Sequence, residues 1–160
     1  MNIIDTPMNT TSSVACLLSK GVRTVIRYYN FSNSRTFPEK AIQLAEAQAI
    51  AAQGMQTAVV FQQRQNQVAD FSELKGMAAG RRAYRYAHDS IGQTPGTAIY
   101  FSVDFDASSS EFKDNITPYF QGIKRAFAEE SAGAPEYRVG AYGSIQRELG
   151  HYLGIRAGGI

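Results

Sequence analysis

Two aspartates follow the most apolar stretch of the chain. Asp104 and Asp106 come directly after residues 97–103, Thr-Ala-Ile-Tyr-Phe-Ser-Val, whose β-branched and aromatic side chains predict a strand buried on both faces. Ligands of parallel sheets bind beside the carboxyl ends of the strands, so these aspartates are candidate site residues. If the strand continues through them they project to the same side, and close like charges favour protonation of one member, as a general acid requires.

A third carboxylate has the same setting. Asp5 ends the short apolar segment Ile3-Ile4 and would lie on the same rim of the sheet. Three carboxylates on one rim fit the cleavage of a glycosidic bond, in which one protonates the leaving oxygen and the others stabilise an oxocarbenium-like centre or activate water. We therefore predict Asp106, Asp104 and Asp5 as catalytic residues.

Two other interpretations of the Asp-x-Asp pair stay open. The aspartates can be turn and capping residues before Ser108, or they can hold Mg²⁺ or Mn²⁺, which prefer carboxylate oxygens. His88 and His151 have no metal-ligand spacing and lie within helical patterns. We therefore expect neither a resident metal nor a cofactor.

Polar and aromatic residues at the ends of the other predicted strands could bind sugar. Aromatic rings stack on pyranose faces, and Arg and Gln side chains hydrogen-bond hydroxyl and acetamido groups. The alternative for each tyrosine is a core position with its hydroxyl bound at the rim. The predicted substrate-binding residues are Arg27, Tyr29, Gln62 and Tyr142.

Short β-rich segments alternate with longer helical patterns along the chain, which is typical of βαβ units around a parallel sheet. The sequence predicts an α/β fold, a partial or complete (β/α) TIM-type barrel with about five units, where a closed barrel needs eight. Gly76 and Gly80 are expected to let their helix approach the sheet closely. We expect residues 1–160 to form a single domain that lacks the last barrel units, which a homo-oligomer could complete. The expected strands are 3–5, 23–29, 57–62, 97–103 and 138–142, and the expected helices are 12–20, 38–53, 71–91, 108–132 and 145–153.

Composition excludes several classes of protein. Sixteen basic and fourteen acidic side chains are scattered along the chain, which gives no support to nucleic-acid binding. No segment is apolar for long enough to span a membrane, and the N-terminus lacks a secretory signal. We expect a protein that is cytoplasmic when made and reaches the cell wall by a non-classical route. The lone Cys16, set among apolar residues, is expected to be buried.

Five segments together resemble a known family. They are Ile-Ile-Asp-Thr-Pro at the start, Val-Ile-Arg-Tyr-Tyr, the helix between Gly76 and Gly92, Thr-Ala-Ile-Tyr-Phe-Ser-Val-Asp-Phe-Asp, and Val-Gly-Ala-Tyr-Gly-Ser. They resemble the glycoside-hydrolase-like family called domain of unknown function 1906, which is similar to the family 25 lysozymes. Those enzymes cleave peptidoglycan on a β/α barrel.

The resemblance implies roles for the three aspartates. Asp106 takes the place of the general acid, Asp104 that of its partner, and Asp5 that of the first-strand carboxylate. The lysozymes carry Asp-x-Glu at this strand end, so Asp106 is one methylene shorter than their acid, and this chain has no Trp. The implied function is acid-assisted cleavage of a β-1,4 bond in peptidoglycan or a related amino-sugar polysaccharide. The alternative is a non-catalytic carbohydrate-binding or interaction module on a degenerate barrel.

Overall fold

Five parallel strands form one sheet in the order in which they occur along the chain. The computed structural model describes residues 2–143. The strands are β1 (Asn2–Asp5), β2 (Val22–Tyr29), β3 (Gln56–Phe61), β4 (Ala98–Val103) and β5 (Arg138–Gly143), paired β1-β2-β3-β4-β5. Within the described part of the chain β1 and β5 do not pair with each other, so the sheet is unclosed. The predicted α/β fold with a partial barrel is confirmed.

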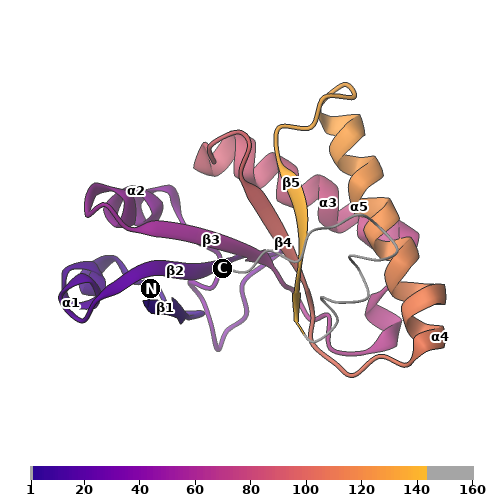
Figure 1. Ribbon diagram of the computed structural model, residues 1–160, viewed down its shortest axis with the longest axis horizontal. Helices are drawn as coiled ribbons and strands as arrows, with labels where there is room; N and C mark the ends of the chain where they lie inside the picture. The colour runs from indigo at the N-terminus through magenta and orange to yellow at the C-terminus, as the bar shows by residue number, and fades with distance from the viewer. Residues whose placement is uncertain (1, 144–160) are drawn as a thin grey trace.

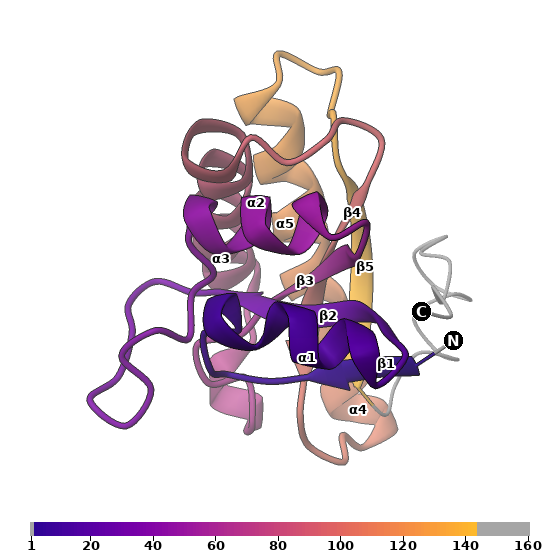
Figure 2. The ribbon, with the colours of Figure 1, turned by 90° about the vertical axis from the view of Figure 1, so that its left-hand side faces the viewer.

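Helices connect successive strands and cover one face of the sheet. Helices α1 and α2 lie beside the first three strands, whereas α3 and α5 lie side by side next to β4 and β5 (Figures 1 and 2). No helix within residues 2–143 is both long and apolar enough to cross a membrane. The α-helices are α1 (Val14–Ser19), α2 (Leu44–Ala52), α3 (Glu73–Arg85), α4 (Ser109–Glu111) and α5 (Thr117–Glu130); 3-10 turns cover Thr11–Ser13 and Val68–Asp70, and π-helical turns cover Tyr86–Ile91 (η3) and Phe112–Ile116 (η4).

The carboxyl-terminal parts of β2, β3 and β4 are buried on both faces, in two separate clusters. The larger core lies between the sheet and the helices and includes Val59, Phe101 and Phe127. The smaller cluster lies on the opposite face and is built from Ile26, Tyr28 and Val60, with Ala58, Tyr100 and Tyr142 packed against it. Successive residues of a strand point to opposite faces, so neighbours in sequence belong to different clusters.

The second face is concave. A hydrogen bond of 2.6 Å joins the side chain of Tyr142 on β5 to that of Asp5 on β1. In a flat sheet these two edge strands would lie roughly 19 Å apart, at about 4.8 Å for each strand spacing. The sheet therefore curves strongly, as the wall of a barrel does, and brings its two edges toward each other. We call the face with Tyr28 and Tyr142 the concave face.

The glycines of α3 serve a contact other than the predicted one. A Cβ at Gly76 would collide with the carbonyl group of Tyr119 on α5, and a Cβ at Gly80 would press on the backbone of Ile123. Gly122 of α5 is equally close to the backbone of α3. The expectation that Gly76 and Gly80 approach the sheet is wrong, because they allow α3 and α5 to pack backbone against backbone.

One predicted helix starts later than expected. The segment 38–43 is not helical, and α2 begins only at Leu44. Tyr28 explains the difference: Ala41 forms a parallel bridge with it, and the Ile42 N–H donates to its carbonyl oxygen at 3.0 Å. This pairing holds the loop beside the carboxyl end of β2 and places Lys40 over the concave face.

Other expectations had mixed outcomes. Ser108 forms the N-cap of α4 in a capping box with Glu111, as its position predicted. Cys16 is exposed, so the expectation of a buried thiol is wrong. Helix α1 is shorter than the helix predicted over 12–20, and Val14 is its one buried residue. The helix expected over 145–153 lies outside the described residues.

Candidate functional site

Asp5 is held between two tyrosines at the carboxyl end of the strands. Tyr28 Oη donates to Asp5 Oδ1 at 2.6 Å, and Tyr142 Oη donates to Asp5 Oδ2 at 2.6 Å. Tyr28 comes from β2 and Tyr142 from β5, both at concave-face positions. The carboxylate of β1 is therefore oriented from both sides while Asp5 itself remains exposed.

Both tyrosines are firm proton donors at neutral pH. Burial, followed by the hydrogen bond to Asp5, raises the pKa of Tyr142 to about 12. The same two causes raise the pKa of Tyr28 well above its ordinary value. Each hydroxyl therefore keeps its proton and its bond to the carboxylate throughout the physiological range.

Lys40 enters the site from the loop after β2. Its Nζ donates to Gln62 Oε1 at 2.9 Å and lies 4.6 Å from the centre of the Tyr28 ring. Gln62 Nε2 in turn donates to Ser102 Oγ at 3.3 Å, so this chain of contacts joins the ends of β3 and β4. Burial lowers the pKa of Lys40, and attraction to Asp5 and Asp104 opposes that shift.

Asp104 lies at the same end of the sheet. Its backbone N–H donates to the Gln65 carbonyl oxygen at 2.8 Å, which ties the end of β4 to the loop after β3. Its negative charge acts on both Lys40 and Tyr142, so its carboxylate lies near both groups. Asp5, Tyr142, Gln62 and Asp104, all predicted from the sequence, are thus brought together.

Asp106 is placed differently from Asp104. Strand β4 ends at Val103, as predicted, so the condition under which both aspartates would project to the same side of the strand is not met. Phe105 turns toward the helices, where its ring lies 5.6 Å from that of Phe71. Asp106 follows in the loop before α4, exposed and without a hydrogen bond or ion pair to any described residue. Its position relative to Asp104 is set by this loop.

Arg27 and Tyr29 do not reach the site, contrary to prediction. They are fully buried on the face that packs against the helices. Arg27 Nε donates to Glu46 Oε1 at 2.7 Å and Arg27 Nη2 to Glu46 Oε2 at 3.0 Å, while Tyr29 Oη donates to Gln93 Oε1 at 2.9 Å. The side chains of both residues point to the face opposite that of Tyr28, and there they stabilise the packing of helices and loops on β2.

Residues 2–143 contain no group of three or more His, Cys, Asp or Glu side chains arranged to hold a metal ion. The functional groups that the candidate site offers are carboxylates, tyrosine hydroxyls and one ammonium group. Such a set can bind a polar substrate, stabilise positive charge and transfer a proton.

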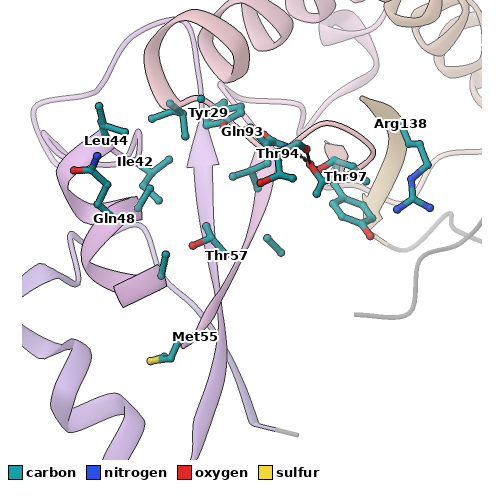
Figure 3. Close-up of a pocket in the computed structure, with 18 residues that line it drawn as sticks. Tyr29, Ile42, Leu44, Gln48, Met55, Thr57, Gln93, Thr94, Thr97 and Arg138 are labelled. Atoms are coloured by element: carbon teal, nitrogen blue, oxygen red, sulfur yellow. Dashed lines mark hydrogen bonds between the residues drawn. The ribbon is translucent and has the colours of Figure 1, made fainter. Parts of the chain in front are cut away.

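A separate cavity of about 480 Å³ lies between α2 and the amino-terminal halves of β3 and β4. Strands β3 and β4 pair only through Val59–Phe61 and Ile99–Phe101, so their amino-terminal ends diverge (Figure 1). The cavity opens there, between α2 and the segment after η3, with Thr57, Met55 and Ile42 among the side chains around it (Figure 3). None of its lining residues is acidic, so it offers no carboxylate for glycoside chemistry.

The chain has relatives of known sequence. Residues 15–150 match the family model of the Rv2525c-like, glycoside hydrolase-like domain. YbfG and FadG, uncharacterised proteins of Bacillus subtilis (strain 168), are 35% identical over 140 residues and 28% identical over 133 residues. The alignments cover 84% and 83% of this chain but 19% and 22% of the relatives, so the chain spans about a fifth of their length.

Solved structures share the fold. The Tat-secreted protein Rv2525c of Mycobacterium tuberculosis, solved in complex with L-tartrate and with HEPES, superposes with a TM-score of 0.72 at 22% identity, over 89% of this chain and 69% of that one. An uncharacterised B. stearothermophilus protein gives a TM-score of 0.67 at 14% identity, over 94% and 66%. At these identities the likeness shows the fold alone.

Proposed function

Since the chain belongs to the Rv2525c-like, glycoside hydrolase-like family, we propose that it cleaves a β-1,4 glycosidic bond in bacterial cell-wall peptidoglycan or a related amino-sugar polysaccharide. The observation that carries this proposal is the Asp5 carboxylate, fixed by Tyr28 and Tyr142 on the same rim as Asp104. A carboxylate held in one orientation can stabilise the oxocarbenium-like transition state without reorganising.

The three aspartates take different roles in this mechanism. Asp5 stabilises the positive charge that develops on the sugar ring, and Asp104 at the end of β4 takes the proton of the water molecule that attacks the anomeric carbon. Asp106 protonates the leaving oxygen, because it is the remaining aspartate after β4 and its exposed side chain is accessible to a substrate. Because Asp is one methylene shorter than Glu, the loop after β4 has to move toward the substrate for this proton transfer.

Release of soluble muropeptides from purified peptidoglycan tests the proposal. We expect Asp106→Asn to lower the rate by about 10²- to 10⁴-fold, the usual contribution of a general acid. Asp5→Asn and Asp104→Asn should also lower it. Asp114→Asn is the matched control, because Asp114 is an exposed aspartate on the helical turn η4 and has no role in the proposed mechanism.

A second candidate function is a non-catalytic carbohydrate-binding module. The unclosed sheet and the placement of Asp106 outside β4 favour it. The wild-type protein would then sediment with peptidoglycan but release nothing. Equal release by the wild type and all three aspartate variants would contradict the assignment of the carboxylates and indicate that the catalytic residues lie elsewhere in the chain. If the protein is instead a metal-dependent hydrolase, a chelator should abolish its activity and Mg²⁺ should restore it.

A further inference from the structure

Lys40 brings a positive charge into a site whose proposed chemistry needs negative charge. An oxocarbenium-like transition state is stabilised by the Asp5 and Asp104 carboxylates, and an ammonium group near them opposes that stabilisation. The negative charges of Asp5 and Asp104 both act on the pKa of Lys40, so the charge of Lys40 acts on these two carboxylates in turn. A lysine at this place therefore weakens the cleavage of a neutral sugar unless it binds something on the substrate.

The contacts of Lys40 leave it free to bind. An ammonium group has three N–H donors, and among the described residues the single acceptor within hydrogen-bond distance of Lys40 is Gln62 Oε1. Within residues 2–143 Lys40 forms no ion pair, and each Asp5 oxygen accepts a hydrogen bond from one tyrosine. Arg27 shows the contrasting case: its guanidinium donates to both oxygens of Glu46 and to two backbone carbonyl oxygens.

The position of Lys40 is fixed even though its loop is otherwise exposed. The Ala41 bridge and the Ile42 hydrogen bond hold the backbone beside β2, and the Tyr28 ring supports the ammonium group from below. Gln62 and Ser102 then fix its distance from β3 and β4. A half-buried, oriented ammonium group with free donors is suited to a charged acceptor rather than to water alone.

We infer that Lys40 is a specificity-determining residue that binds a carboxylate on the sugar next to the bond that is cleaved, so that the site selects acidic over neutral saccharides. This inference rests on the proposed function for the location of the sugar. The substrate class it names is an amino-sugar polymer that carries an acid group on its ring substituent or ring carbon. The substrate's own charge then offsets that of Lys40 beside the reacting centre.

Equilibrium binding of two matched saccharides tests this inference. One is a β-1,4-linked disaccharide of N-acetylglucosamine and N-acetylmuramic acid with a free lactyl carboxylate, and the other is the same disaccharide with that carboxylate reduced to an alcohol. By calorimetry at low salt we expect the wild-type chain to bind the acid about tenfold more tightly, as a charge-assisted hydrogen bond allows. Lys40→Met should abolish the preference by weakening binding of the acid about tenfold more than binding of the alcohol, and Lys40→Arg should keep most of the preference.

Lys20→Met is the matched control. Lys20 is an exposed lysine just before β2, at the amino end of the sheet, so its loss changes the net charge equally but leaves the preference intact. A preference that persists in Lys40→Met, or a wild-type chain that binds neither disaccharide or both equally, would overturn the inference. So would an equal loss of both affinities in Lys40→Met, which would indicate that Lys40 acts by positioning Gln62.

The same reagents separate this inference from the proposed function. Selective binding of the acid without muropeptide release would contradict the hydrolase proposal and leave the role of Lys40 standing. Cleavage of peptide-free glycan strands, whose lactyl carboxylates are free, at the same rate as the same strands with those carboxylates reduced would contradict the role of Lys40 and leave the hydrolase proposal standing.

Discussion

Arg27 and Tyr28 are neighbours on β2, and each binds a carboxylate, but on opposite faces of the sheet. Arg27 binds Glu46 on the helix-covered face, where both side chains are fully removed from solvent. Tyr28 binds Asp5 on the concave face, where the carboxylate remains exposed. Two similar pairings at one strand end therefore differ in what they do: the buried pair stabilises the fold, whereas the exposed carboxylate is accessible to a ligand.

The number of internal partners sharpens the contrast. Glu46 Oε1 accepts from the Thr10 backbone at 2.7 Å and from Thr10 Oγ1 at 2.9 Å, in addition to Arg27. Arg27 also donates to the backbone carbonyl oxygens of Thr6 at 2.8 Å and Glu39 at 2.7 Å. This cluster joins β2, α2 and the loops that follow β1 and β2, and both of its charged side chains are fully buried. Asp5, with one tyrosine on each oxygen, keeps lone pairs that face solvent.

The largest expected effect comes from breaking the buried pair. Glu46→Gln leaves the Arg27 guanidinium buried without a counter-charge, so we expect the free energy of unfolding to fall by about 3–5 kcal/mol. Urea denaturation followed by circular dichroism measures the change. Glu129→Gln is the control: Glu129 pairs with Arg81, but both side chains are 40% exposed, so its loss should cost less than about 1 kcal/mol. Similar small losses in both variants would contradict the structural role of Arg27.

The sequence does not reveal which residues of a buried parallel strand point to which face of the sheet. Residues 24–29 of β2 are all buried, so hydrophobicity does not alternate and the two faces look alike in sequence. For this reason Arg27 and Tyr29 were assigned to the wrong face and Tyr28 was not selected. Ser108 shows the opposite case, because a helix N-cap depends on local sequence alone, and the predicted start of the helix at residue 108 agrees with Ser108 as the N-cap of α4.

The candidate site was predictable where its residues end strands. Asp5, Gln62 and Asp104 follow apolar segments directly, and the order of parallel strands then brings them to one edge. Lys40 was missed because its position depends on the pairing of Ala41 with Tyr28, a contact between a loop and a strand. Pro38 and Glu39 favour the first turn of a helix locally, and this tertiary pairing overrides that preference.

Two adjacent tyrosines allow a closer comparison of the faces. Tyr28→Phe removes the bond to Asp5, and Tyr29→Phe removes the bond to Gln93. Each should lower the free energy of unfolding by about 1 kcal/mol, the usual net value of one hydrogen bond. Tyr28→Phe alone should also lower muropeptide release, by roughly tenfold, because only it loosens a carboxylate at the site. Equal effects of both variants on release would remove the functional distinction between the faces.

The smallest effect is a change in tyrosine ionisation. The pKa values of Tyr142 and Tyr137 are both raised to about 12, chiefly by burial, but only Tyr142 owes part of its shift to Asp5. Tyr137 belongs to the core beneath the helices. Asp5→Asn removes the negative charge beside Tyr142, so we expect the pKa of Tyr142 to fall toward its ordinary value of about 10 while that of Tyr137 stays in place.

NMR of the tyrosine Cζ carbons measures both ionisations, with Tyr142→Phe and Tyr137→Phe assigning the signals. A tyrosine whose folded pKa is raised stabilises the fold fully below pH of about 10 and loses that contribution as pH rises toward about 12. The stability lost by the wild-type chain across this window should therefore be smaller in Asp5→Asn. If the pKa of Tyr142 does not move, burial alone accounts for its shift, and the two faces of the sheet differ in exposure but not in the electrostatic role of their carboxylates.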